Sequence, residues 1–359
     1  MVAHVQRVAA LQKIAFEQAH FDGYVILSPS NLTYFTGVQG TASLLIPKDG
    51  EGTVYVHGVN YEHTRANVKD FGVDLVDRGE DLLAKIARRA DQQGIKKLAV
   101  DAVGVDGWHS LSKQTRGKIK LKTKPDFISQ LRAVKDEEEI ALMRKAAELT
   151  SLGMKTAHET LKAGMTEFEL AAGIEYAMRK HGSYGTAFDT IASSGSSSAF
   201  PHGGCTDREI RTGELVVVDI GAVYKNYRSD MTRTLAVGKP SGKQQKIYDV
   251  VKKAQDEAFA AMRPNVKTRD VDAAARRIIS EAGYGEFFVH GLGHGVGLDI
   301  HEPPTLSPTS KEKLQAGNVA TDEPGIYLVG YGGVRIEDTM LVTKEGAEML
   351  TVGPYELGK

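Results

Sequence analysis

Two aspartates stand among apolar residues in the segment Val216–Val237, VVVDIGAVYKNYRSDMTRTLAV. Asp219 and Asp230 lie almost symmetrically about a turn expected near Tyr224–Tyr227. The segment therefore predicts a β-hairpin in which the two carboxylates lie opposite each other or one diagonal apart, with Thr232 on the face of Asp230. Like charges at such positions repel, and a buried carboxylate is costly unless it is paired or bound to a metal. We therefore expect a cation between the two aspartates.

A second segment, ATDEPGIYLVGYGGVRIEDTMLV, repeats this arrangement. It carries Glu323 and Glu337 on either side of a glycine-rich turn at Gly330–Gly333. Successive side chains of a strand point to opposite faces, so Arg335 shares the face of Glu337. For the same reason Asp322 points away from the face of Glu323, and we expect that it does not bind a metal.

Histidines lie between the two predicted hairpins. The segment Phe288–Pro304, FVHGLGHGVGLDIHEPP, contains His290, His294 and His301 among glycines. Four carboxylates and at least one imidazole form an oxygen-rich ligand set that suits Mn²⁺, Co²⁺ or Zn²⁺. Their charge is too high for one divalent ion and suits two, as in two-metal hydrolases with bridging carboxylates. A single aspartate in a strand is usually solvent-exposed, but the coincidence of two hairpins and a histidine segment favours a metal site.

The elements that position these residues belong to the second of two predicted domains. Residues 1–128 alternate short strands and helices, as in a small α/β domain. Strands are expected at Tyr24–Ser28, Ala42–Pro47 and Gly52–Gly58, and a helix is expected to end at Gly94.

Residues 129–359 contain three helical segments separated by strands and turns, which predicts an α+β domain. One helical segment begins after Lys135 with three glutamates, which suit the positive end of a helix dipole. Another begins with the capping-box pair Thr166 and Glu169 and ends at Gly182, and the third ends at Gly283.

Composition narrows the class of protein. The chain has 359 residues, of which 41% are hydrophobic and 25% are charged, and its net charge is −1. This balance is ordinary for a globular protein and implies no nucleic-acid partner. Cys205 is the only cysteine, so an intramolecular disulfide and a cysteine-based zinc site are excluded.

The N-terminal Met1–Gly23 reads as an amphipathic helix rather than a signal peptide, and no apolar run approaches a membrane span. We expect a cytoplasmic protein that does not associate with membranes.

The motifs together resemble those of the "pita-bread" metallopeptidases, which include prolidase, X-Pro aminopeptidase and methionine aminopeptidase. They occur in the family's order and cover most of residues 130–345. The motifs that carry the resemblance are VVVDIGA, SDMTRT, HGLGHGVGLDIHE, DEPGIY and GGVRIED. In addition, RAVKDEEEIALMRKA and NLTYFTG (Asn31–Gly37) are similar to segments of prolidases and X-Pro aminopeptidases, whose N-terminal domain methionine aminopeptidases lack.

The resemblance implies a pita-bread catalytic domain behind a smaller α/β domain of the creatinase N-terminal type. It also implies five ligands for two divalent ions, with Asp230 and Glu337 shared between the ions. The implied ligands are Asp219, Asp230, His294, Glu323 and Glu337. The same resemblance implies catalytic roles for Glu323 and for His202, which matches a histidine on the substrate side. It implies that His290 and His301 hold the substrate and the tetrahedral intermediate, and that Arg335 acts beside the metals.

The implied activity is hydrolysis of the Xaa-Pro bond by a dinuclear metal site holding Mn²⁺ or Co²⁺, with Zn²⁺ as an alternative. We favour an Xaa-Pro dipeptidase that forms a homodimer. An X-Pro aminopeptidase acting on longer peptides is the main alternative, and a lyase or a non-catalytic member of the fold is less favoured. A nucleophilic Cys205, a serine nucleophile in GSSSA (Gly195–Ala199) and a dinucleotide site in GLGHGVG each leave the five clustered ligands unexplained or lack the required pattern.

Overall fold

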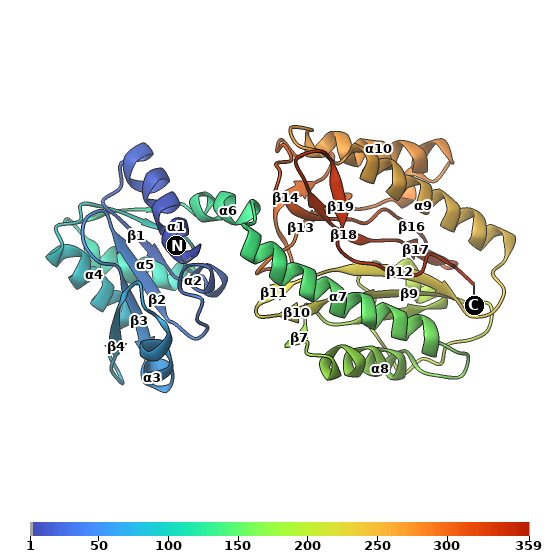
Figure 1. Ribbon diagram of the computed structural model, residues 1–359, viewed down its shortest axis with the longest axis horizontal. Coiled ribbons are helices and arrows are strands. Elements are labelled where there is room, and N and C mark those ends of the chain that lie inside the picture. The colour runs from blue at the N-terminus through green and yellow to red at the C-terminus, as the bar shows by residue number, and fades with distance from the viewer. Residues whose placement is uncertain (1–2, 359) are drawn as a thin grey trace. The chain divides into compact units, whose positions relative to one another are not determined.

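The computed structural model describes residues 3–358, which form two compact units that divide between Arg132 and Ala133. The helices and strands of each unit are labelled in Figure 1. The predicted domain boundary, between residues 128 and 129, and the observed division both fall within helix α6 (Asp126–Ala133). The predicted order, a smaller α/β unit followed by a larger α+β unit, is confirmed.

The first unit contains one mixed six-stranded sheet in the order β4-β3-β2-β1-β5-β6. Strand β1 pairs antiparallel with β2 and parallel with β5. The strands are β1 (Gly23–Ile26), β2 (Ser43–Pro47), β3 (Thr53–His57), β4 (Gly72–Val76), β5 (Lys97–Val100) and β6 (Lys120–Thr123). The helices are α1 (Ala3–Gln12), the π-helical η1 (Lys13–Gln18), α2 (Pro29–Thr36), α3 (Gly58–Asn67), α4 (Leu82–Gln92) and α5 (Val105–Thr115), with α6 at the end.

Local signals account for the bounds of several elements in this unit. Asp81 caps α4, because its carboxylate accepts hydrogen bonds from the backbone N–H groups of Leu83 and Ala84. The helix ends before Gly94, which has a φ of 71° and lies at the predicted C-terminal position. The predicted N-terminal helix is present as α1 and η1, and its first residues, Met1 and Val2, lie outside the described residues.

The second unit contains four long helices and several short sheets. The helices are α7 (Glu137–Thr160), α8 (Glu167–Lys180), α9 (Gly242–Ala261) and α10 (Thr268–Glu281), with short 3-10 helices η2 (Gly195–Ala199) and η3 (Gly285–Phe287). The predicted capping box of Thr166 and Glu169 begins α8. The strands are β7 (Gly185–Thr186), β8 (Ile191–Ser194), β9 (Leu215–Ile220), β10 (Ala222–Tyr224), β11 (Tyr227–Arg228), β12 (Met231–Ala236), β13 (Gly293–Gly295), β14 (Glu302–Leu306), β15 (Val319–Asp322), β16 (Gly325–Leu328), β17 (Gly332–Arg335), β18 (Asp338–Val342) and β19 (Ala347–Met349).

Two hydrophobic cores hold the helices against these strands. Met154 and Ile174, from α7 and α8, pack in one core with Val218 of β9. The other core joins α9 and α10 to the C-terminal strands, for example Val251 with Met340. Figure 1 shows α9 and α10 along one side of the strands and α8 along the other. The strands that position the site residues are therefore covered by helices on both sides.

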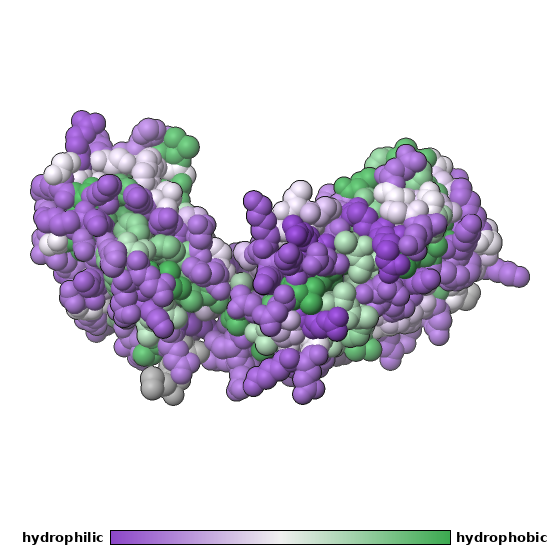
Figure 2. Space-filling model, turned by 90° about the horizontal axis from the view of Figure 1, so that it is seen from above, coloured by the Kyte–Doolittle hydropathy of each residue, from purple (hydrophilic) through white to green (hydrophobic). Residues whose placement is uncertain are grey.

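The visible surface is mainly polar. Hydrophilic residues cover most of the face shown in Figure 2, and apolar residues occupy smaller areas. None of the helices in residues 3–358 combines the length and the apolarity that crossing a lipid bilayer requires.

Candidate active site

The first predicted hairpin is confirmed, and its register places the two aspartates one diagonal apart. Strands β9 and β12 are antiparallel, with Asp219 opposite Thr232. Asp230 lies one residue before β12, so its position faces Gly221 rather than Asp219. The hairpin turns at Lys225–Asn226, where both residues have positive φ, as the type I′ turn requires.

The second hairpin places Glu323 and Glu337 opposite each other at a break in its ladder. Asp322 pairs with Asp338 before the break and Gly325 pairs with Arg335 after it. At the break, the backbone N–H of Glu323 donates to Leu292 O at 2.9 Å, and that of Glu337 donates to Thr232 O at 3.0 Å. The backbone of Glu323 is thus hydrogen-bonded to the histidine segment, and that of Glu337 to the first hairpin.

His294 lies on β13, between β14 and β15. The glycines beside it permit this close packing. A Cβ at Gly293 would lie 2.2 Å from Thr321 O, and one at Gly295 would lie 2.3 Å from Pro303 O. The protonated Nδ1 of His294 donates to Gly295 O at 3.1 Å, so the lone pair is on Nε2. The Nε2 atom lies 3.3 Å from Glu323 Oε1 and 3.7 Å from Asp230 Oδ2.

The structure brings the five predicted ligands together. One ligand atom from each of Asp230, His294 and Glu337 lies within 4.8 Å of the other two. Glu323 contacts His294 as described above, and Asp219 Oδ2 accepts a hydrogen bond from Arg335 Nη2 at 2.6 Å. Thr232 Oγ1 donates to Glu337 Oε2 at 2.5 Å, and Thr321 Oγ1 donates to Glu323 Oε1 at 3.1 Å. Neighbouring hydroxyl groups therefore orient the glutamates.

The carboxylates repel one another in the absence of added cations. Burial, followed by the negative charge of Asp219, raises the pKa of Asp230 well above its usual range. Burial and then Asp230 do the same for the pKa of Glu337, and burial raises the pKa of Glu323. Burial lowers the pKa of His290, His294 and His301, so these rings are neutral near pH 7.

The donor set fits divalent metal ions. Asp219 Oδ1 and Asp230 Oδ1 are buried and have no hydrogen-bond partner within residues 3–358, although unpaired buried carboxylate oxygens are costly. The four carboxylates of the predicted ligand set share a single arginine, Arg335, among the residues that line the cavity. A cluster of carboxylate oxygens with one neutral imidazole is a ligand set of the kind that binds Mn²⁺, Co²⁺ or Zn²⁺.

The five predicted ligands line a cavity of 790 Å³ in the second unit. All nine predicted metal-binding and catalytic residues line this cavity. They are His202, Asp219, Asp230, His290, His294, His301, Glu323, Arg335 and Glu337. The His294 and His301 rings are in edge-to-face contact, with their centroids 4.2 Å apart. Phe188, Ile191 and Val289 supply apolar surface to the same cavity.

Tyr327 is a polar residue at the site that the sequence analysis did not identify. Its hydroxyl donates to His290 Nε2 at 2.9 Å and accepts from Arg335 Nη1 at 2.9 Å, while His290 Nδ1 donates to Gly291 O. Burial raises the pKa of Tyr327 to about 12, so the hydroxyl keeps its proton. The hairpin register could have revealed it, because Tyr327 lies one diagonal from Arg335, as Asp230 does from Asp219.

Asp322 lies outside the cavity, opposite Asp338. Both of its carboxylate oxygens are buried and have no partner in the part of the chain that the structure describes. Burial, followed by the charge of Asp338, raises the pKa of Asp322 well above the usual range. Cys205 also lies outside the cavity lining. Its Sγ donates to Thr190 O at 2.9 Å, and burial raises the pKa of the thiol, which disfavours a reactive thiolate.

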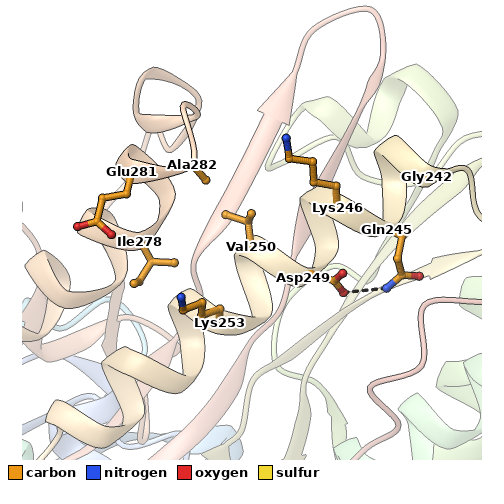
Figure 3. A pocket seen from close by; sticks show the side chains of 9 residues that line it. All are labelled: Gly242, Gln245, Lys246, Asp249, Val250, Lys253, Ile278, Glu281 and Ala282. Atoms are coloured by element: carbon orange, nitrogen blue, oxygen red, sulfur yellow. Dashed lines mark hydrogen bonds between the residues drawn. The ribbon is translucent and has the colours of Figure 1, made fainter.

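A second hollow lies between α9 and α10 (Figure 3). No histidine lines it, and its charged side chains, such as Lys246 and Glu281, are exposed to solvent. It lacks the buried, unpaired charges of the cavity.

Comparison with known proteins decides the family. Residues 141–344 match the model of metallopeptidase family M24, and residues 7–134 match the creatinase/prolidase N-terminal domain. This chain belongs to metallopeptidase family M24. It is 40% identical to an Xaa-Pro dipeptidase of Pyrococcus furiosus over 98% of this chain and 99% of that protein.

Solved structures show the same architecture over the whole length. The prolidase from Pyrococcus horikoshii OT3 matches with a TM-score of 0.92 and 37% identity, covering 98% of this chain and 99% of that one. An X-Pro aminopeptidase from Thermotoga maritima MSB8 matches with a TM-score of 0.86 and 34% identity, covering 94% and 98%. The predicted family, its two-domain fold and its metallopeptidase activity are thereby confirmed.

Proposed function

We propose that this M24 metallopeptidase hydrolyses the bond before proline in Xaa-Pro dipeptides, using two divalent ions per chain. The observation that carries the proposal is the convergence of five ligand side chains and four further polar residues on one cavity. The similarity to an Xaa-Pro dipeptidase and to a prolidase supports the same substrate class. Mn²⁺ or Co²⁺ are the ions that we propose, with Zn²⁺ as the alternative.

Asp219, Asp230, His294, Glu323 and Glu337 would hold the ions, with Asp230 and Glu337 shared between them. When bound, the pair of ions supplies the Lewis acidity that makes water a nucleophile near neutral pH. The hydroxyl groups of Thr232 and Thr321 hold Glu337 and Glu323 in place for this role.

The proton transfers are assigned to residues of the chain. Glu323 accepts a proton from the attacking water at its carboxylate and delivers it to the proline nitrogen, which must be protonated as it leaves. His202 and the neutral His301 donate N–H groups to the substrate oxygen on which negative charge develops. His290 does so only if it exchanges its present contact with Tyr327, because both of its ring nitrogens are engaged.

A specific observation keeps an X-Pro aminopeptidase as the second candidate. A dipeptide brings a free carboxylate into the cavity, and a buried carboxylate needs a cation or several donors. Arg335 is the one cationic side chain of the cavity lining, and it already donates to Asp219, Thr232 and Tyr327. Longer peptides carry no carboxylate at this position and therefore avoid the requirement.

The experiment that separates the candidates uses matched substrates with added Mn²⁺ or Co²⁺. For a dipeptidase, Leu-Pro is cleaved much faster than Leu-Pro-Gly-Gly, and amidation of the Leu-Pro carboxylate weakens binding. Equal or faster release of leucine from the longer peptide would assign the activity to an X-Pro aminopeptidase. Failure to cleave either substrate in the metal-loaded protein would refute both. A homodimer and a cytoplasmic location stay predictions, the first of which sedimentation analysis tests.

A further inference from the structure

One fully buried carboxylate of the second unit lies outside the cavity and has every acceptor position filled. Glu167, the first residue of α8, is 1% exposed. Its Oε1 accepts from the backbone N–H and the hydroxyl of Ser194 at 2.7 and 2.6 Å. Its Oε2 accepts from the backbone N–H and the hydroxyl of Thr206 at 2.9 and 2.7 Å. Each oxygen thus binds a different segment of the chain.

The two segments are the ends of one loop. Ser194 is the last residue of β8, and Thr206 follows the loop formed by residues 195–205. This loop carries His202, and it reaches the cavity through His202 and its neighbours Pro201 and Gly204. A single carboxylate therefore holds the beginning and the end of the loop together, and the charge-assisted bonds are of the stronger kind.

The His202 ring depends on the loop for its position. Among residues 3–358, its side chain is exposed and makes no hydrogen bond to another residue, whereas both ring nitrogens of His290 are bonded. The loop is bonded to β17 at two points: the backbone N–H of Gly333 donates to Ser198 Oγ at 2.9 Å, and Arg335 Nη1 donates to Pro201 O at 3.4 Å, but neither bond involves the His202 ring. The backbone of residues 195–205 must therefore set where the imidazole lies.

We infer that Glu167 is a positioning residue: by closing the loop 195–205 it sets the place of the His202 imidazole at the cavity. The inference rests on the proposed function, because it takes His202 as a group that contacts the substrate. A purely structural role for Glu167, as an acidic residue at the N-terminus of α8, would stabilise the helix without any link to His202.

The test is a double-mutant cycle between Glu167→Gln and His202→Ala, with Glu169→Gln as the matched control. Glutamine keeps the shape of the side chain but turns one oxygen into a donor that faces two other donors. Glu169 is exposed on the same helical turn and bonds only within the capping box. Each variant is loaded with Mn²⁺ and assayed for kcat and KM on Leu-Pro and Leu-Pro-Gly-Gly.

We expect Glu167→Gln to lower kcat/KM on the order of 10-fold on the better substrate, because small misplacements of a group at the reacting bond are costly. Metal content stays at the wild-type level, and Glu169→Gln stays near wild-type activity. In the His202→Ala background, Glu167→Gln causes little further loss, because residues that act through each other are not additive. Equal losses in both backgrounds, or no loss in either, would overturn the inference.

A second measurement does not depend on activity. Amide hydrogen exchange of residues 195–205 is expected to be faster in Glu167→Gln than in wild type and unchanged in Glu169→Gln. Unchanged exchange in Glu167→Gln would overturn the inference, even if the wild-type protein cleaved no Xaa-Pro substrate and the proposed function had failed. If Glu167→Gln does not fold, Thr206→Val and Thr206→Ser replace it, with faster exchange and lower kcat/KM expected for the valine variant only.

Discussion

Two groups of buried polar residues lie on opposite faces of the strands of the second unit, and their charges are neutralised in different ways. We call Asp219, Asp230, Glu323 and Glu337 the front cluster, and Arg233, Gln255, Asp338, Thr351 and Tyr355 the back cluster. Neighbours in sequence belong to different clusters, as Glu337 and Asp338 do, because strand side chains alternate.

The ion pair of the back cluster, Arg233 with Asp338, is neutralised within the protein. Asp338 accepts from Arg233 and Thr351 through one oxygen and from Gln255 and Tyr355 through the other, at 2.7 to 3.0 Å. Arg233 is fully buried and also donates to the backbone oxygens of Thr232, Glu337 and Pro354. One cation, one anion and their hydrogen bonds balance, as a buried ion pair requires.

The front cluster is incomplete. Four carboxylates share Arg335, and two of their buried oxygens, Asp219 Oδ1 and Asp230 Oδ1, have no partner. On one face of these strands the fold neutralises the Arg233–Asp338 pair, and on the other face it leaves carboxylates to be neutralised by ions from outside. A buried charge is thus evidence for a functional site only when the protein does not itself supply its partner.

The largest effect is expected from Asp230→Asn. Loss of this front-cluster ligand should reduce activity by at least ~100-fold, the upper range for disturbing even an outer partner of a metal ligand. Metal analysis should show a greater loss of bound ions than in Asp219→Asn, because Asp230 is the proposed shared ligand. Wild-type activity in chelator-treated protein, or full metal occupancy in Asp230→Asn, would break the distinction between the two clusters.

The back cluster should respond in stability rather than in metal binding. Asp338→Asn leaves the charge of Arg233 buried and unpaired, which is expected to lower the free energy of unfolding by about 3–5 kcal/mol. Denaturant unfolding of the metal-loaded protein measures this change, with bound metal determined on the same sample. A stability close to wild type would mean that the back cluster is not the self-contained ion pair described above.

His202→Ala tests whether the cavity residues divide into metal ligands and residues that do not bind metal. We expect kcat to fall by about 10²-fold, as for loss of one donor to a developing oxyanion. Metal content should stay near wild type, whereas His294→Ala should lose both metal and activity. The reverse pattern of metal loss would show that the roles of the two histidines are exchanged.

Asp322→Asn should have the smallest effect, and it depends on pH. The raised pKa of Asp322 means that the folded protein holds this proton more tightly than the unfolded chain does. The wild type should therefore lose stability as the pH rises from the ordinary carboxyl value of 3.8 towards the raised pKa, whereas Asp322→Asn lacks this loss.

Denaturant unfolding of the wild type and of Asp322→Asn at several pH values measures their free energies of unfolding. The variant should become more stable relative to the wild type as the pH rises, while activity and metal content stay unchanged. A variant that is less stable than wild type at every pH would show that the Asp322 carboxyl group is required in its buried position.

The residues and their spacing predicted the four carboxylates and the two hairpins that present them, and the family resemblance added His294 to the proposed ligand set. The register of the hairpins is local: Asp219 and Asp230, like Glu323 and Glu337, are separated by a short turn, so symmetry and alternation suffice to place them on one face. The family resemblance extended this prediction to His202, His290, His301 and Arg335, all of which line the cavity.

The tertiary structure was needed to show which charges are neutralised within the protein and which residue closes the loop 195–205. Three sets of contacts join residues far apart in the chain: the bond from Glu337 to Thr232, the bond from Arg335 to Asp219, and the four bonds that Glu167 accepts from Ser194 and Thr206. Such contacts depend on how separate elements pack, and no local pattern of residues encodes the distance between them.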